Sequence, residues 1–361
     1  MIYCINPDCP NPQNPNRQTY CISCGIKLLP ILRSRYSAKE VLKDFQRQSM
    51  VDPGLKTIFT SSTRRKFLTL AGLSIVAVSI YGGPIYGVQS STNLQTFNFE
   101  TVTVDVEGKI TKRQSHQAKF FSEDLGSGAI LEMILVPGGR FDMGSPNTEV
   151  GCDRDEWPQH NVNISPFFMS KYKVTQSQWE AVMGNNPSNF KGAQRPIENI
   201  SWNDAVAFCQ KLTQKTGKHY RLSSEAEWEY ACRAGTKTPF YFGETIAPNL
   251  VNYDGNYPYG SAPKGLDRGQ TTDVGIFPPN AFGLYDMHGN LWEWCSDGYH
   301  SNYNGAPNDG SSWKTPTDNF RVQRGGCWKN DAVYCRTAIR KWNFAGFHNS
   351  YIGFRLALAF P

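Results

Sequence analysis

The sequence of 361 residues lacks the motifs of several common enzyme classes. It contains no Gly-x-Ser-x-Gly elbow and no glycine-rich phosphate-binding loop, so neither a hydrolase nucleophile nor a nucleotide site is indicated. Four of its six histidines, His160, His219, His288 and His348, lie on separate segments without metal-ligand or catalytic spacing. We therefore interpret them as structural or surface residues.

The chain also lacks a basic stripe in its larger part. Residues 1–66 carry eleven Lys/Arg and four Asp/Glu, whereas the remainder carries 26 basic and 27 acidic residues. Nucleic acid is therefore not expected as a partner. Apolar residues make up 39% of the chain and aromatic residues 13%, which is enough for a large core with loops held by aromatic packing.

Four cysteines near the start follow the pattern Cys-x4-Cys-x11-Cys-x2-Cys, namely Cys4, Cys9, Cys21 and Cys24. Two pairs of thiolates at such spacing can form a tetrahedral zinc site. Because this proline-rich stretch has little apolar material, the metal would supply most of its folding energy. We predict a zinc ribbon or knuckle over 1–29, similar to a four-cysteine module found in some cyanobacterial signalling proteins. The alternative is free or disulfide-paired cysteines.

A basic linker, 30–66, precedes an uncharged stretch at 67–88. The residues Thr63-Arg64-Arg65-Lys66-Phe67-Leu68 resemble a twin-arginine export signal. A run of about 22 uncharged residues can cross a bilayer, and the preceding basic residues would keep the N-terminus in the cytoplasm. We predict a membrane anchor or an export signal. The alternatives are a cleaved signal and a buried helix, and a chain without an anchor or export signal would be cytoplasmic.

The remaining residues divide into lead-in strands, 89–128, and a larger domain, 129–361. Alternating apolar residues from Phe97 to Val106 predict a hairpin closed at Glu107-Gly108. A second strand pair is predicted at 133–136 and 140–143, around Pro137-Gly138-Gly139.

Three helices are predicted from their end signals. The signals are Thr175-x-x-Gln178 with Gly184, Ser201-x-x-Asp204 with Gly217, and Ser224-x-x-Glu227 with Gly235. In the second helix, Ala205, Phe208, Cys209 and Leu212 form an apolar stripe, so Cys209 is expected in the core. After residue 236 no helical period is present, and we expect loops and short strands.

Several motifs resemble the formylglycine-generating enzyme, or sulfatase-modifying factor, domain family. They are Arg324-Gly325-Gly326, Trp328, Cys335-Arg336, Arg340 and Gly353-Phe354-Arg355, together with Val136-Pro137-Gly138-Gly139, Arg221-Leu222-Ser223-Ser224-Glu225 and Gly289-Asn290-Leu291-Trp292-Glu293. The resemblance implies an α+β, loop-rich domain with the C-type-lectin fold over 129–361. It also implies structural calcium.

Calcium prefers oxygen ligands, and Asp286-x-x-Gly289-x-Leu291-x-Glu293 places two carboxylates and two carbonyls close together. The resemblance implies that Asp286, Gly289, Leu291 and Glu293 bind one calcium ion, and that Asn252 and Tyr253 belong to a second site. The alternative is that Glu293 accepts hydrogen bonds from backbone amides in a loop.

The family's oxidase activity uses two cysteines that bind copper, and Cu(I) prefers thiolates. The resemblance places Asn330 at the first of these positions and Cys335 at the second. Asparagine cannot supply a thiolate, so we predict that the chain is not an enzyme. Pairing among Cys152, Cys209, Cys232, Cys295, Cys327 and Cys335 cannot be deduced from the sequence.

The last part of the chain resembles the variable proteins of diversity-generating retroelements, whose lectin-fold surface binds a partner. The resemblance implies a binding surface at about 327–351 formed by Lys329, Asp331, Tyr334, Thr337, Ile339, Lys341, Trp342, Asn343, Phe344, Phe347, Asn349, Ser350 and Tyr351. Its ligand, a protein or a surface molecule, is not indicated. The alternatives are a copper-dependent formylglycine-generating oxidase and an undiversified signalling or scaffold module.

Overall fold

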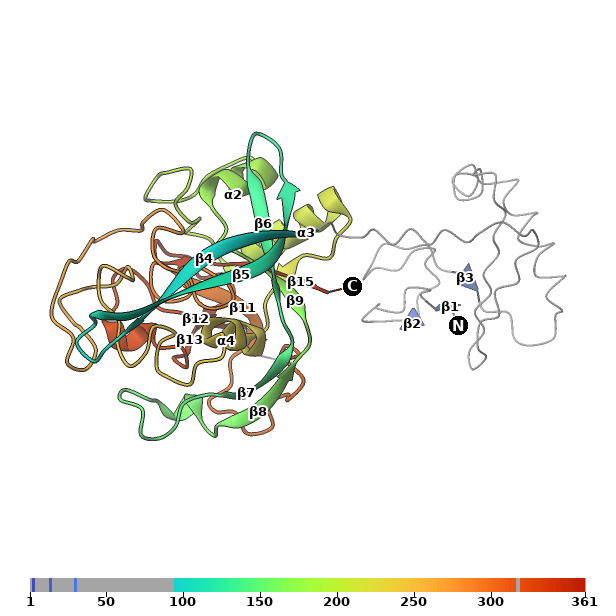
Figure 1. The fold of residues 1–361 in the computed structure, drawn as a ribbon. Coiled ribbons are helices and arrows are strands. Elements are labelled where there is room, and N and C mark those ends of the chain that lie inside the picture. Colours follow the sequence, from blue (N-terminus) through green and yellow to red (C-terminus); the bar gives the residue numbers. More distant parts are fainter. Residues whose placement is uncertain (1, 4–12, 15–28, 31–93, 316–318, 361) are drawn as a thin grey trace, which may run out of the picture. The chain divides into compact units, whose positions relative to one another are not determined.

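The computed structural model describes residues 2–3, 13–14, 29–30, 94–315 and 319–360 (Figure 1). The chain forms two compact units, Met1–Gln89 and Ser90–Pro361. In the first, β1 (Ile2–Tyr3), β2 (Gln13–Asn14) and β3 (Leu29–Pro30) pair in the order β2-β1-β3. The four predicted zinc ligands and the 67–88 stretch lie outside the described residues.

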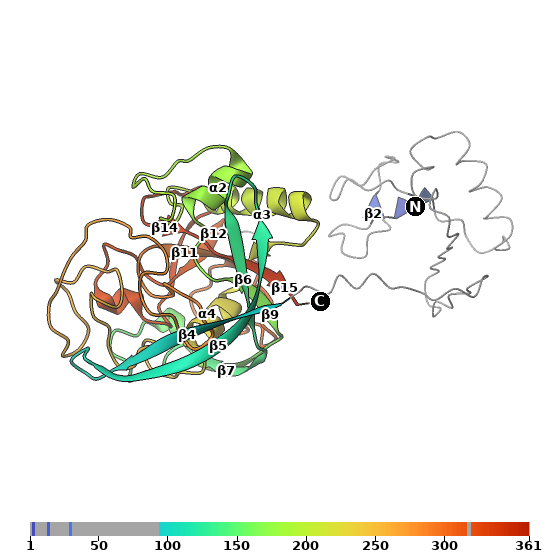
Figure 2. The same cartoon turned by 45° about the horizontal axis from the view of Figure 1, so that its top comes forward.

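A six-stranded antiparallel sheet forms one side of the second unit. Its order is β10 (Arg221–Leu222), β15 (Leu356–Ala359), β9 (Phe167–Ser170), β6 (Ile130–Val136), β5 (Ile110–Asp124) and β4 (Gln95–Val104). The predicted lead-in hairpin is present as β4 and β5, which extend together as a long ribbon (Figures 1 and 2). Its turn is held by Asp105, whose Oδ1 accepts the backbone N–H of Glu107 at 3.0 Å and of Lys109 at 2.9 Å.

A four-stranded sheet carries most of the C-terminal segment. Its order is β13 (Lys341–Phe344), β12 (Phe320–Arg324), β11 (Trp292–Gly298) and β14 (Ile352–Gly353), with β14 parallel to β11. In this sheet β13 is an edge strand.

The predicted pairing of the strands around Pro137 is wrong. β6 pairs with β5 and β9, whereas β7 (Gly139–Met143) pairs with β8 (His160–Ile164) in a separate two-stranded sheet. The connection between β6 and β7 packs closely against the end of β8. A Cβ on Gly138 would lie 2.8 Å from the Ile164 carbonyl oxygen and 2.8 Å from Cδ of Pro166. The chain therefore enters a second sheet instead of returning along β6.

The three predicted helices are confirmed as α2 (Gln176–Met183), α3 (Trp202–Thr216) and α4 (Glu225–Arg233). Each begins with the predicted reciprocal capping box. The left-handed residue that ends α4 is Ala234, one residue before the predicted Gly235. Two short 3-10 helices are η2 (Arg154–Glu156) and η3 (Ala332–Cys335). None of the helices in the described part of the chain is long and apolar enough to cross a membrane.

The core contains aromatic side chains from distant parts of the chain. Phe208 of α3 stacks on Trp179 of α2 at 5.4 Å and meets Phe354, just before β15, at 5.4 Å. The predicted stripe of α3 is buried, including Cys209. Because β12 and β15 are both built into sheets, the chain between them is held at each end.

Candidate functional site

The C-terminal segment turns sharply after β12 at Gly325 and Gly326, whose φ angles are +97° and +75°. A Cβ on Gly326 would lie 2.6 Å from Sγ of Cys335 and 2.6 Å from the Tyr334 carbonyl oxygen. Only glycine fits this conformation and this close approach. The turn therefore packs η3 directly against the end of β12.

Four arginines of the C-terminal motifs are buried and paired with glutamates, and we call these pairs the arginine frame. The pairs are Arg324 with Glu225 and Glu229, Arg336 with Glu149 and Glu156, Arg340 with Glu225, and Arg355 with Glu293. The contact of Arg336 with Glu156 is bidentate, at 2.7 and 3.0 Å. Arg324 also donates to the carbonyls of Ala338 and Ile339, at 2.7 and 2.6 Å. The frame thus determines the path of the chain between η3 and β13.

Asn330, at the position of the first family cysteine, has a hydrogen-bonding role in this structure. Its Oδ1 accepts hydrogen bonds from Nε1 of Trp292 at 2.8 Å and from the Cys327 thiol at 2.9 Å. Its backbone carbonyl accepts the N–H of Asp254 at 2.9 Å. The side chain therefore joins two neighbouring groups in the place where the enzymes carry a thiolate.

The two cysteines nearest to this position are fully buried. Burial raises the pKa of the Cys327 thiol to about 12 and raises that of Cys335 well above its ordinary value. Without a metal, both thiols are therefore protonated at neutral pH. The six cysteines of the described residues are free, with no disulfide among them.

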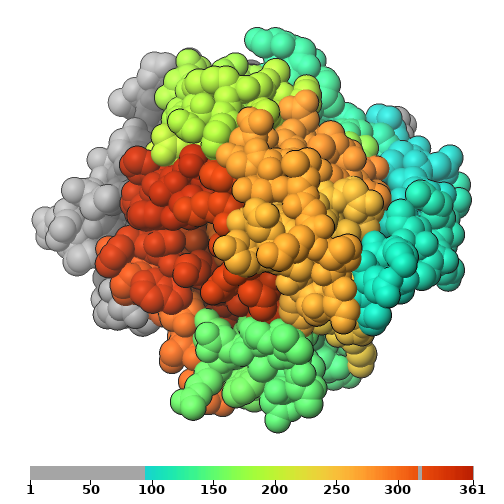
Figure 3. Space-filling model, turned by 90° about the vertical axis from the view of Figure 1, so that its left-hand side faces the viewer, coloured from blue at the N-terminus to red at the C-terminus, as the bar shows by residue number. Residues whose placement is uncertain are grey.

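The predicted surface residues divide into three groups by exposure. Lys329, Tyr334, Lys341, Trp342 and Phe344 are exposed, whereas Asp331, Asn343, Phe347, Asn349, Ser350 and Tyr351 are half-buried. The prediction is wrong for Thr337 and Ile339, which are 0% and 7% exposed. Arg324 holds the carbonyl of Ile339 in the interior, and the Thr337 hydroxyl lies 3.8 Å from Sγ of Cys232. Figure 3 shows the segment, in red, on one face beside the loops before β11, in orange.

Four aromatic residues form a continuous strip at the edge of the four-stranded sheet, and we call them the aromatic strip. They are Tyr299, Phe320, Trp342 and Phe344. The ring centroid of Phe320 lies 4.5 Å from that of Trp342 and 4.3 Å from that of Phe344, and Tyr299 lies 5.3 Å from Trp342. Trp342 is 40% exposed and Phe344 is 59% exposed. Tyr299 and Phe320 were not predicted, because the pairing that places Phe320 opposite Phe344 joins two separate strands.

Phe347 and Tyr351 are not members of this strip, although they were predicted to be exposed together with Trp342 and Phe344. Both are half-buried and pack against the core cluster that contains Phe354. The Lys329 ammonium lies 3.8 Å from the centre of the Tyr351 ring. Among the predicted residues, the exposed aromatic side chains are therefore Trp342 and Phe344 on β13 and Tyr334 in η3.

Most of the predicted calcium ligands around Glu293 have other partners, although Oδ1 of Asp286 is buried without one. Lys173 donates to the Glu293 carboxylate and, at 2.7 Å, to the carbonyl of Asp286. The Gly289 carbonyl accepts the N–H of Leu291 at 2.9 Å, and Oδ2 of Asp286 accepts that of Gly275 at 2.7 Å. This arrangement does not fit calcium at Glu293, because a lysine already lies between the expected ligands.

The Asn252 region is different. Its Oδ1 is buried without a hydrogen-bond partner, while its Nδ2 donates to Gln270 and Asn290. A buried carbonyl oxygen of this kind is a suitable calcium ligand. Asn252 and the adjacent Tyr253 carbonyl thus remain compatible with a cation. Within the described residues no group of three or more His, Cys, Asp or Glu side chains could hold a metal ion.

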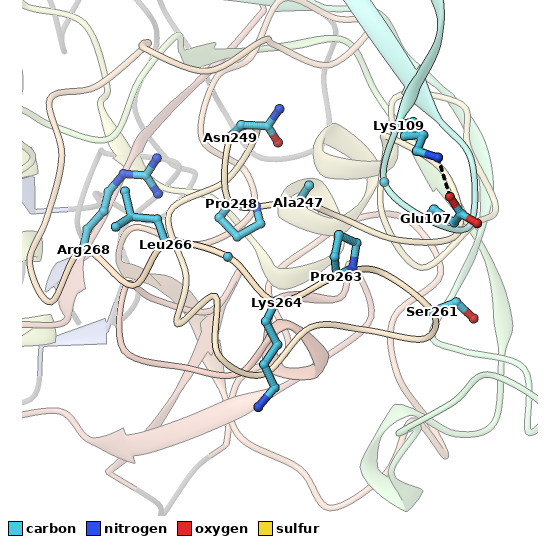
Figure 4. Close-up of a pocket in the computed structure, with 12 residues that line it drawn as sticks. Glu107, Lys109, Ala247, Pro248, Asn249, Ser261, Pro263, Lys264, Leu266 and Arg268 are labelled. Carbon is cyan, nitrogen blue, oxygen red and sulfur yellow. Dashed lines mark hydrogen bonds and ion pairs between the residues drawn. The ribbon is translucent and has the colours of Figure 1, made fainter.

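A surface hollow of about 600 Å³ lies elsewhere, between the β4–β5 turn and the loop 247–268 (Figure 4). Glu107 and Lys109 form an ion pair of 2.6 Å on one side, and Arg268 lies on the other. None of the predicted site residues lines this hollow. Its charged side chains come from separate segments and do not converge on one point in Figure 4.

Comparisons with known proteins agree with this architecture. The model of the sulfatase-modifying factor enzyme 1-like domain matches residues 121–360. The structure of PvdO from Pseudomonas aeruginosa is 34% identical, covers 66% of this chain and 98% of its own, and gives a TM-score of 0.59. Treponema denticola variable protein 1 is 27% identical, covers 66% of this chain and 99% of its own, and gives a TM-score of 0.58. The formylglycine-generating enzyme of Mus musculus is 28% identical over 63% of this chain and 75% of its own.

These matches span the region that carries the C-terminal motifs and the buried arginine frame. They confirm the family and the C-type-lectin type of fold that the sequence predicted. The chain belongs to the sulfatase-modifying factor enzyme 1-like domain family.

Proposed function

We propose that the chain is a non-catalytic binding protein that holds a protein or another surface ligand on the aromatic strip. The observation that carries this proposal is the exposure of Trp342 and Phe344 on an edge strand anchored by buried ion pairs. Exposed apolar patches mark interaction sites, and large aromatic side chains contribute much of the energy of interfaces. They also lose little side-chain entropy on binding.

The surroundings of Asn330 support a role without oxidase chemistry. At the position that the resemblance assigns to the first copper-binding cysteine, Asn330 is engaged with Trp292 and cannot supply a thiolate. The alternative function, a copper-dependent formylglycine-generating oxidase, is favoured by the similarity to formylglycine-generating enzymes such as that of Mus musculus. It predicts that the full chain, incubated with copper and a sulfatase-type cysteine peptide, converts the thiol to an aldehyde. Mass spectrometry should show an unchanged peptide if the binding proposal is correct.

The binding surface also suits diversification by a retroelement, and we include this in the proposal. Similarity to a variable protein of Treponema denticola supports it, as does the contrast between buried frame residues and exposed surface residues. A reverse-transcriptase gene and a near-identical template repeat beside the gene would be expected. Variation should spare the buried positions Thr337 and Ile339. An undiversified signalling or scaffold module would lack the repeat.

Binding can be tested with a phage-displayed peptide library selected on the full chain. Peptides that bind the strip should lose at least about 30-fold in affinity for Trp342→Ala/Phe344→Ala, which is about 2 kcal/mol, the size of a hot spot. The matched control is Tyr257→Ala/Leu266→Ala, since Tyr257 and Leu266 are 57% and 60% exposed and lie outside the strip. Selected peptides that bind both variants like the wild type would contradict the proposal.

The N-terminal part of the proposal concerns tethering. We infer that Cys4, Cys9, Cys21 and Cys24 hold zinc and that 67–88 anchors or exports the domain. The paired cysteine spacing and the uncharged run after Arg64-Arg65-Lys66 support these roles. Metal analysis of the full chain should give about one zinc, which is lost in Cys4→Ser/Cys24→Ser. Fractionation of cells should place the chain with membranes or outside the cytoplasm.

A further inference from the structure

The Glu293 carboxylate receives more than the usual number of hydrogen bonds for a buried acid. Oε1 accepts from Lys173 and from Nη2 of Arg355 at 3.2 Å. Oε2 accepts from Nε of Arg355 at 2.7 Å and from Nε1 of Trp228 at 3.0 Å. A carboxylate has about four lone-pair positions, so these four donors leave no oxygen for another ligand.

Lys173 is held at this point by the backbone hydrogen bonds of the residue that follows it. The next residue, Val174, donates its N–H to the Phe354 carbonyl at 3.0 Å and accepts from the N–H of Ile197 at 2.8 Å. The Lys173 side chain is fully buried, and its ammonium bridges the Glu293 carboxylate and the Asp286 carbonyl. It therefore contacts one of the four oxygen groups that the sequence assigns to calcium, the Glu293 carboxylate, and the backbone carbonyl of a second assigned residue, Asp286.

The cluster already contains basic and acidic side chains in equal number. Lys173 and Arg355 are buried together with Glu293 and Asp286. A divalent cation added here would have to displace the ammonium or introduce two unbalanced charges in the interior.

We propose that the Lys173 ammonium takes the place of a structural calcium ion in this chain, so that the Glu293 site binds no divalent metal. The lysine provides one positive charge and directed N–H donors to oxygen groups that would otherwise coordinate a cation. The proposal does not concern calcium at Asn252, whose side chain bonds to Gln270 and Asn290. The proposal is independent of the binding role of the aromatic strip.

The dependence of the melting temperature on calcium tests whether the Lys173 ammonium replaces a calcium ion at Glu293. In metal-stripped full chain, Lys173→Ala should lower Tm by roughly 10 °C, as expected when a buried carboxylate loses its partner. Millimolar calcium should then raise the Tm of Lys173→Ala by several degrees more than that of the wild type. The extra increment should vanish in Lys173→Ala/Glu293→Gln. Lys171→Ala is the matched control, since Lys171 pairs with Glu132 at 3.2 Å outside the cluster.

No extra calcium response in Lys173→Ala would overturn the proposal, because the vacated position would then not suit the metal. Crystals of the wild type grown in calcium give a test that does not depend on the variant folding. Anomalous scattering should show no calcium at Glu293. The electron density should show the Lys173 ammonium in contact with the Glu293 carboxylate. A calcium peak between Glu293 and Asp286 would refute the exchange.

Discussion

Two groups of residues in the same C-terminal segment have opposite environments. The arginine frame lies in the interior, with Arg324, Arg336 and Arg355 each at 1% exposure or less. The aromatic strip, only a few residues away in sequence, exposes Trp342 and Phe344. Charged groups are thus buried and apolar groups exposed, which is the reverse of the usual distribution.

Because of this reversal, different residues determine the path of the segment and the chemistry of its surface. Buried ion pairs add little net stability, but each is costly to break, so the frame strongly disfavours other paths for the segment. The strip makes the smaller contribution to folding because part of its apolar area remains in water. Residues of the strip can therefore be exchanged without unfolding the domain, as a binding surface open to variation requires.

The largest expected effect is on the frame. Arg336→Met should destabilise the chain by about 3–5 kcal/mol, because it leaves the buried carboxylates of Glu149 and Glu156 without their partner. Denaturant unfolding measures this loss. The matched control is Arg113→Met, whose pair with Glu100 is exposed and should contribute no more than about 1 kcal/mol. Equal effects of the two substitutions would show that the frame has no special role.

Acid should destabilise the buried interior of the domain through His288. This buried imidazole donates from Nδ1 to the Cys335 carbonyl at 2.8 Å and accepts the N–H of Tyr241 at 3.0 Å. Burial lowers its pKa from 6.5 to about 3, so between these values the unfolded chain binds more protons than the folded chain. Stability is therefore full above pH 6.5 and falls as the pH falls toward 3.

The expected loss from this histidine is about 3 kcal/mol between pH 6.5 and 4, at about 1.4 kcal/mol per pH unit. His288→Gln should lower stability at pH 7 and reduce the slope over this range. His219→Gln, at an exposed position, is the control. An unchanged slope in His288→Gln, measured by unfolding at several pH values, would exclude His288 as the source.

Local features of this domain were predictable from the sequence, and distant contacts were not. Each helix start depends on a side chain and a backbone group three residues apart, as for Ser201 and Asp204, so the signal is contained in the sequence. The end of α4 at Ala234 differs by one residue because a non-glycine residue adopts the left-handed conformation there. Strand pairing is not local, and this is why β6 and β7 were wrongly joined.

The site shows the same limit. The carboxylate of Glu293 matched an oxygen pattern for calcium, but its partner Lys173 lies 120 residues earlier and has no motif that links the two. Thr337 and Ile339 were predicted at the surface because the resemblance to variable proteins implies a binding surface over the whole of their segment. Ile339 is held by Arg324 of β12, which donates to its carbonyl, and Thr337 lies against Cys232 of α4. The exposed residues Lys341, Trp342 and Phe344 were found because they interrupt a motif that otherwise matches the family.

The smallest effect is expected in the aromatic strip. Phe344 and Phe354 are ten residues apart and have opposite environments, so the same substitution can be compared at both. Phe354 is 0% exposed and packs on Phe208, so Phe354→Ala should cost about 3–5 kcal/mol. Phe344 is 59% exposed on the edge strand, and Phe344→Ala should change the free energy of unfolding by no more than about 0.5 kcal/mol. Denaturant unfolding of the two variants beside the wild type separates these values easily. A loss of several kcal/mol in Phe344→Ala would mean that the strip is part of the core, and a surface that cannot change without unfolding could not serve as a variable binding site.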